Sequence, residues 1–322
     1  MADTHRGNQT SSTEFILLGF GDLPQMEIFL FLLFLLIYIV TVSGNILIIA
    51  LAVANRHLHT PMYFFLGNLS CLETCYTSTI LPRVLASLLT GDKTISISGC
   101  ITQYYFIGSF AGAECYLLAV MSYDRFLAIC KPLHYAVFMN GRFCLQLAAG
   151  SWINGFLAMT IVIVLMLQLS SCGPNEIDHF YCESTEILNL YCSDTNQIEL
   201  VITFLAAIFT LPSFVLTVAS YVCIITIILR IPSTTGRQKA FSTCSSHLIV
   251  VTIFYGTIMI LYMLPKTNTL RALNKVFSVF YTVLTPMANP FIYSLRNTEV
   301  KETIGKMSWG RHFPMEGVDL DC

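Results

Sequence analysis

Seven long intervals of the chain contain almost no charged residue, and this pattern limits what the chain can fold into. A helix needs about 20 mostly apolar residues to cross the hydrocarbon core of a bilayer. Two of the intervals are interrupted by a single acid, Glu73 or Glu114. The intervals cover residues 28–55, 57–82, 94–123, 143–175, 200–229, 240–265 and 276–295. The pattern predicts an all-α membrane protein, a bundle of seven transmembrane helices.

The composition supports this class and excludes others. Hydrophobic residues make up 55% of the chain and charged residues 11%, whereas soluble domains usually carry about a quarter charged residues. The formal net charge of -2 gives no basic surface for nucleic acid. We expect a multi-pass membrane protein surrounded by lipid.

The distribution of Lys and Arg predicts the orientation. Basic residues concentrate on one side of the predicted bundle, which makes that side cytoplasmic. They are Arg56, Arg125, Lys131, Arg142, Arg230, Arg237, Lys239, Arg296, Lys301, Lys306 and Arg311. The other side carries an acidic segment before the fifth span and a glycosylation acceptor at Asn8. We therefore expect an extracellular tail (1–26), a bundle (27–296) with an outer loop (168–199), and a cytoplasmic short amphipathic helix and tail (297–322).

Four cysteines lie on the predicted outer side, where disulfides are permitted. Cys100 opens the third span, and Cys172, Cys182 and Cys192 lie in the acidic loop. Four cysteines allow three pairings, and the spacing does not choose among them.

Six strings, in order along the chain, resemble a known family. They are Gly44-Asn45, residues 61–66 (PMYFFL), 121–130 (MSYDRFLAIC), Ser220-Tyr221, 239–248 (KAFSTCSSHL) and 286–293 (PMANPFIY). With seven spans, they resemble the rhodopsin-like G-protein-coupled receptors, and among them the odorant (olfactory) receptors of the tetrapod-type class. Phe126 departs from the family, which usually has Tyr there.

The resemblance implies a set of properties. It pairs Cys100 with Cys182 and Cys172 with Cys192. It implies a stimulatory, olfactory-type heterotrimeric G protein as partner, a rise in cAMP, and a place in the plasma membrane of olfactory cilia.

Two polar motifs are candidates for an activation switch. Asp124 and Arg125 end the third span, where a half-desolvated ion pair can break when a partner competes for the guanidinium; the alternative is a solvated pair at a helix end. Asn289 and Pro290 interrupt the seventh helix, and Tyr293, like Tyr221 in the fifth span, can move between water and the bundle. The alternative for Pro290 is a tolerated kink.

Glu73 and Glu114 are costly because each lies within a span. Two unpaired charges are prohibitive, so the pair either shares a proton or holds a cation. The resemblance implies a sodium site, with Ser70 and Asn289 nearby. The family more often has Asp at position 73.

The predicted ligand site is uncharged. The outer half of the third span, 101–113, has no charge, and neither have the outer parts of the last three spans. A buried charged ligand would lack a counter-ion, so the site suits a small uncharged organic molecule, and the resemblance implies that this is a volatile odorant. The third span presents Ile107, Gly108, Ala111 and Gly112 on one face. The resemblance places opposite them Leu205, Ala206, Phe209, Tyr255, Ile258, Met259, Tyr262, Val279 and Thr282.

Within this set, Tyr262 and Thr282 are the expected hydrogen-bonding groups. Gly108 and Gly112 also form a small-xxx-small pair, so close helix packing is an equal alternative to pocket lining.

Other function classes fit less well. The chain contains neither HExxH nor Gly-x-Ser-x-Gly, so we expect no enzyme and, apart from the possible sodium ion, no cofactor. A transporter usually shows internal repeats and paired broken helices. The sequence favours a receptor.

Overall fold

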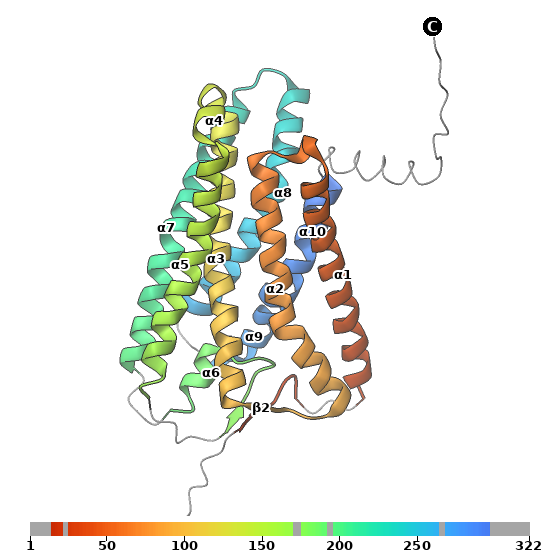
Figure 1. Cartoon of the computed structure of the whole chain (residues 1–322), viewed down its shortest axis with the longest axis vertical. Helices are drawn as coiled ribbons and strands as arrows, with labels where there is room; N and C mark the ends of the chain where they lie inside the picture. Colours follow the sequence, from red (N-terminus) through yellow and green to blue (C-terminus); the bar gives the residue numbers. More distant parts are fainter. Residues whose placement is uncertain (1–13, 22–24, 170–174, 192–195, 264–267, 297–322) are drawn as a thin grey trace, which may run out of the picture.

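The computed structural model is a bundle of long helices with a small β-sheet at one end (Figure 1). It describes residues 14–21, 25–169, 175–191, 196–263 and 268–296. The bundle contains α1 (Glu27–Ala54), α2 (Pro61–Thr90), α3 (Ile97–Cys130), α5 (Gly141–Met166), α7 (Asn196–Leu229), α8 (Thr234–Met263), and a last column of α9 (Asn268–Val279), the π-helical turn η2 (Phe280–Leu284) and α10 (Thr285–Arg296). Shorter elements are η1 (Arg56–Leu58), α4 (Pro132–Phe138), α6 (Ser184–Leu188), β1 (Glu14–Leu17), β2 (Thr94–Ser96) and β3 (Glu176–Ile177).

Each predicted interval corresponds to one helical column, but the ends differ. α2 continues through Pro82 and Arg83 to a left-handed Gly91 with a φ of 72°, and α3 continues past Arg125. A charged residue ends an apolar stretch without ending the backbone hydrogen bonding of a helix. The fourth interval is the opposite case, because α5 ends at Met166, before the predicted end at Asn175.

By length and apolar composition, four helices among the described residues are able to cross a membrane. They are Glu27–Ala54, Ile97–Cys130, Gly141–Met166 and Gln197–Leu229. α8 adds a shorter apolar stretch, His247–Ile260. The amphipathic helix expected after the seventh span, Asn8, and the Cys172 and Cys192 pair lie outside the described residues.

Small residues set the closest helix contacts. α3 packs against α2, α5 and α7. A Cβ added to Gly112 would lie 3.1 Å from the Cα of Gly155 in α5, so two glycines face each other where α3 crosses α5. A Cβ on Gly44 of α1 would lie 2.9 Å from the Cβ of Pro290 in α10. In each contact a glycine lets the neighbouring membrane helix approach closely.

We call the end that carries Cys100 the outer end and the end that carries Arg125 the inner end. At the outer end the three strands form a sheet in the order β2-β1-β3. β1 pairs antiparallel with β2 and parallel with β3. Together with residues 175–191, these strands form what we call the outer cap.

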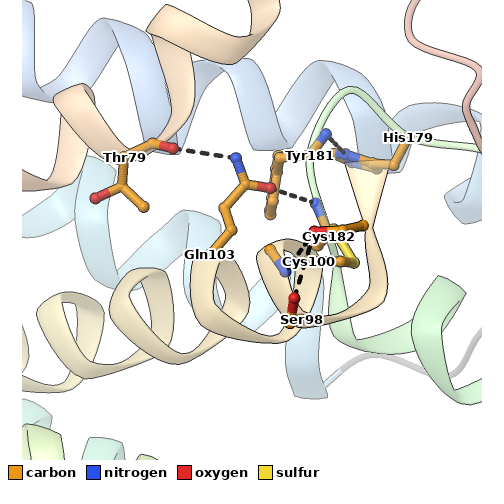
Figure 2. Close-up of a disulfide and its surroundings, with 9 residues drawn as sticks. Thr79, Ser98, Cys100, Gln103, His179, Tyr181 and Cys182 are labelled. Atoms are coloured by element: carbon orange, nitrogen blue, oxygen red, sulfur yellow. Dashed lines mark hydrogen bonds between the residues drawn. A yellow bond between two sulfur atoms is a disulfide. The ribbon is translucent and has the colours of Figure 1, made fainter. Parts of the chain in front are cut away.

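The outer cap is bound to α3 by a disulfide (Figure 2). Cys100 and Cys182 are bonded, with their Cα atoms 5.5 Å apart, as the resemblance implied. Beside them the Gln103 amide donates to the carbonyl oxygen of Thr79 in α2 at 3.0 Å and accepts from the Cys182 backbone N–H at 3.1 Å. One side chain thus joins α2, α3 and the cap.

Several titratable side chains are buried within the cap, His179 and Glu183 among them. His179 lies between the rings of Phe180 and Tyr181, and burial, followed by the nearby Lys275, lowers its pKa to about 3. Burial raises the pKa of Glu183, whose carboxylate accepts from the backbone N–H of Thr185 at 2.8 Å at the start of α6. Lys275 donates to Asp178 at 2.5 Å and thereby links α9 to the cap.

Candidate ligand-binding site

A cavity of about 130 Å³ lies in the outer half of the bundle, with walls from several helices and from the cap. None of the described residues that form its walls is charged. Its polar groups are hydroxyls on Tyr104, Ser184, Thr210 and Tyr281, and the Cys115 thiol. The walls are Tyr104, Gly108, Ala111, Gly112, Cys115, Ala158, Met159, Val162, Ser184, Ile202, Leu205, Ala206, Phe209, Thr210, Ile258 and Tyr281.

The sequence interpretation overlaps with these walls in part. Seven of the proposed residues line the cavity: Gly108, Ala111, Gly112, Leu205, Ala206, Phe209 and Ile258. Ile107, Tyr255, Met259, Val279 and Thr282 are not among its walls, and the side chain of Tyr262 lies outside the described residues.

The hydroxyls of two of these five residues have other partners. Thr282 donates to the carbonyl oxygen of Ser278, one turn earlier, at 2.7 Å. Tyr255 donates across the bundle to the carbonyl oxygen of Cys115 at 2.8 Å. Tyr255 therefore joins α8 to the α3 segment that forms the base of the cavity.

α5 contributes a wall that sequence reasoning missed. A Cβ added to Gly108 would lie 2.7 Å from the Cε of Met159, so Met159 fills the space that Gly108 leaves open. Close helix packing and pocket lining were the two alternatives for Gly108 and Gly112. Both hold, since the two glycines pack against α5 and line the cavity. The sequence signal was the small-residue pair itself, which indicates a close helix without saying which one.

A buried polar network lies further toward the inner end. The Asn289 amide of α10 donates to Glu73 of α2, and the Asn45 amide of α1 donates to the carbonyl oxygen of Pro286 at 3.3 Å. Glu114, 3% exposed, is close enough to Glu73 for the two carboxyls to interact electrostatically. Of the four proposed sodium residues, the structure thus brings Glu73, Glu114 and Asn289 into one region, and Ser70 lies one turn before Glu73 in α2.

The oxygens of this network fit a hard cation. Among the described atoms, Glu73 Oε2, Asn289 Oδ1, Asn45 Oδ1 and Thr77 Oγ1 are buried without a hydrogen-bond partner. Hard cations are bound by carboxylate, amide and other oxygen ligands. The described residues include no group of three or more His, Cys, Asp and Glu side chains suited to a metal ion.

At the inner end of α3, Asp124 has a partner other than Arg125. The Tyr135 hydroxyl in α4 donates to Asp124 Oδ1 at 2.9 Å, and Asp124 is 1% exposed. In the described part of the chain no ion pair joins Asp124 to Arg125. Phe126, at the position where the family usually has Tyr, packs beside Tyr123.

A hydrogen bond joins the inner halves of α7 and α8. Tyr221 and His247 approach to 2.6 Å between the hydroxyl and Nδ1, and both side chains are buried. Pro290 lies inside α10, against Gly44. The side chain of Tyr293 lies outside the described residues.

Comparisons with known proteins agree with this architecture. The family model described as "Olfactory receptor" matches residues 34–310. The chain is 50% identical over 297 residues to human "Olfactory receptor 10A7", covering 92% of this chain and 94% of the relative. It is 48% identical over 300 residues to mouse "Olfactory receptor 5AP2", covering 93% and 95%. The same identity and length relate it to rat "Olfactory receptor 1f45", covering 93% and 96%.

The helical bundle, its internal cavity and these matches define a G-protein-coupled receptor with seven transmembrane helices, which is not an enzyme. The chain belongs to the olfactory receptor family. It is a multi-pass membrane receptor that binds an odorant and couples to a G protein.

Proposed function

We propose that this receptor binds a small uncharged volatile molecule in the cavity between α3, α5, α7 and α8 and activates a stimulatory, olfactory-type G protein, which raises cAMP. The observation that carries the proposal is the uncharged cavity wall. A charged ligand would lose its hydration there without gaining a counter-ion. An apolar molecule with one oxygen would bury its apolar surface there. Its oxygen would form a hydrogen bond with the hydroxyl of Tyr104, Thr210 or Tyr281.

The size of the cavity favours a compact ligand. An apolar cavity of about 150 Å³ is large enough to bind benzene, and this one measures about 130 Å³. Met159 is unbranched and adaptable, so it sets the boundary on the α5 side. Tyr262 remains a predicted hydrogen-bonding residue.

The inner end suits a protein partner and a cytoplasmic position. The short α4 exposes three large apolar side chains, with exposed fractions of 90% for Leu133, 71% for Val137 and 50% for Phe138. Contiguous exposed apolar surface of this kind marks an interaction site. The basic residues Arg125 and Lys131 lie at the same end, in agreement with the positive-inside rule. We therefore propose that this end faces the cytoplasm and docks the G protein.

We further propose, from the family resemblance, that the receptor lies in the plasma membrane of olfactory cilia, with the tail 1–26, including Asn8, outside and 297–322 inside. The bundle is 27–296, and the outer loop 168–199 carries the proposed Cys172–Cys192 bond beside Cys100–Cys182.

Activation requires that an agonist prefer one arrangement of the bundle over another. We assign this change to the single hydrogen bonds that join helices beneath the cavity: Tyr255 to Cys115, Glu73 to Asn289, and Tyr221 to His247. When bound, a sodium ion would supply positive charge to Glu73, Glu114 and Asn289, with Ser70 alongside. These residues would then hold the resting arrangement more firmly. We propose that this arrangement changes at Asp124, Arg125, Pro290 and Tyr293 when the G protein couples.

Two neighbouring alanines of α7 test the ligand site. Ala206 lines the cavity, whereas Ala207 does not. Ala206→Leu fills part of the small cavity, so we expect at least a tenfold rise in the effective concentration of any active volatile, about 1.4 kcal/mol. Ala207→Leu is the matched control and should leave potency within twofold. The measurement is cAMP across a panel of volatiles at equal surface expression.

Equal losses in the two variants would show that the cavity is not the odorant site. A response through calcium release without cAMP would instead contradict the stimulatory G protein and leave the ligand site intact.

A further inference from the structure

A second and larger cavity lies at the inner end, outside the helix bundle. It measures about 730 Å³, against about 130 Å³ for the ligand cavity. It lies where the end of α1, the start of α2 and the start of α5 meet. We call it the inner groove; its walls include Ile49, Val53, Leu58, Phe64 and Cys144.

The inner groove is open to the surroundings of the bundle. Val53 is 72% exposed and Phe64 39% exposed, on helices of a chain that belongs to a family of membrane receptors. Gly67 also lines the groove, and a Cβ added there would have no heavy atom within 4 Å. Most walls of the groove are apolar, with His59, Thr60 and Asn68 as polar members, and such a recess offers a hydrocarbon chain burial against apolar side chains.

The rim of the inner groove is basic. Arg56 and His57 belong to η1, directly before Leu58, and Arg142 follows Gly141 of the groove wall. All three side chains are exposed. Among the described residues no carboxylate forms an ion pair with either arginine. The helices α2 and α5 both begin at this rim, so the positive ends of their dipoles add to the charge.

We propose that the inner groove binds an anionic phospholipid of the cytoplasmic leaflet, with an acyl chain in the groove and the headgroup between Arg56 and Arg142. Basic pockets between transmembrane helices on the cytoplasmic side recognise anionic headgroups. A sterol has a single hydroxyl and gains nothing from two guanidinium groups, and an apolar helix of a second receptor would leave both charges unpaired. The proposal rests on the cytoplasmic position of the inner end but on neither the odorant site nor the G protein.

Trp152 of α5 provides a reporter for the groove. Its indole N–H donates to Asn68 Oδ1 at 3.3 Å, and Asn68 lines the groove. The chain contains one other tryptophan, Trp309, which Trp309→Phe removes. The purified Trp309→Phe receptor is reconstituted into phosphatidylcholine vesicles that contain brominated-chain phosphatidylserine or, separately, the same fraction of brominated-chain phosphatidylcholine. Bromine quenches tryptophan fluorescence on contact.

We expect stronger quenching by the serine lipid, and a preference that falls about fivefold for each of Arg56→Gln and Arg142→Gln. Gly67→Leu should reduce quenching by either lipid, because the leucine fills the groove without a backbone clash. Arg230→Gln and Gly256→Leu are the matched controls, since Arg230 is an exposed inner-end arginine away from the groove and Gly256 also has open space. Both should keep the wild-type preference.

Three results would overturn the proposal. One is equal quenching by the two lipids, and another is a preference that survives both arginine substitutions. The third is displacement of the brominated serine lipid by cholesterol added to the vesicles, which would assign the groove to a sterol. Odorant-evoked cAMP plays no part in the readout, so these outcomes are independent of the proposed function.

Discussion

The two ends of the bundle are held together by different kinds of bonds. The outer end has a disulfide, a three-stranded sheet and the Lys275–Asp178 ion pair. At the inner end, single hydrogen bonds between side chains join the helices, Asp124 with Tyr135 and Tyr221 with His247. A covalent bond survives a change of packing, whereas a hydrogen bond worth about 1 kcal/mol breaks readily. The outer end is therefore suited to keeping a ligand cavity in shape, and the inner end to changing shape.

The largest expected effect is at the Cys100–Cys182 bond. It closes a loop with a sequence separation of 82, for which the chain-entropy model gives a stabilisation of about 4–5 kcal/mol. Cys100→Ser or Cys182→Ser should therefore abolish folding, measured as surface expression. The control is the Cys172→Ser, Cys192→Ser double variant, in which a loop of about 20 residues contributes less. Greater loss in the double variant would reverse the assignment.

An intermediate effect is expected at the inner end. Tyr221→Phe removes the hydroxyl bonded to His247 Nδ1, and His247 Nε2 already has no partner among the described atoms. A buried polar group left unpaired costs about 1–3 kcal/mol. If this bond belongs to the resting arrangement, its loss moves the balance toward the active one by about fivefold or more.

The measurement for Tyr221→Phe is basal cAMP at matched surface expression. Tyr123→Phe serves as the control, because Tyr123 is half-buried at the same end of the bundle and makes no hydrogen bond in the described part of the chain. Unchanged basal cAMP in Tyr221→Phe, or an equal rise in Tyr123→Phe, would mean that the bond does not hold the resting arrangement.

The contrast between the ends also explains what the sequence could predict. Each span is a local property of about 20 residues, so the charge gaps located the helical columns. The α3 wall of the cavity was predicted from the residues that share one face of the helix. The α7 wall was predicted from the family resemblance. Met159 and Ser184 were missed because their place depends on how α5 and the cap pack, which no local pattern records.

The pairing of β1 with β2 and β3 was missed for the same reason, since short strands distant in sequence carry no amphipathic signal. Thr282 donates its hydroxyl to its own helix, a frequent choice for a threonine in a membrane helix, and its hydrogen bond to a ligand stays a prediction.

The smallest expected effect tests whether the outer cap is as firm as its bonds indicate. His179 has a folded pKa of about 3, lowered by burial and by Lys275 and raised slightly by Asp178, against about 6.5 in an unfolded chain. Between these values the unfolded chain binds the proton and the folded cap does not. The stabilisation is therefore full above about pH 6.5 and is lost as the pH falls toward 3.

Acidification from pH 7.5 to 5.5 should thus destabilise the purified receptor by about 1 kcal/mol through His179, seen as a lower thermal midpoint. Glu183 acts in the opposite direction, because its raised folded pKa makes the folded cap bind a proton more readily than the unfolded chain. His179→Gln should therefore flatten the decline in the thermal midpoint, whereas Glu183→Gln should steepen it. If both variants follow the wild-type curve, the cap opens to water far more often than its disulfide and sheet indicate, and the contrast between a firm outer end and a changeable inner end fails.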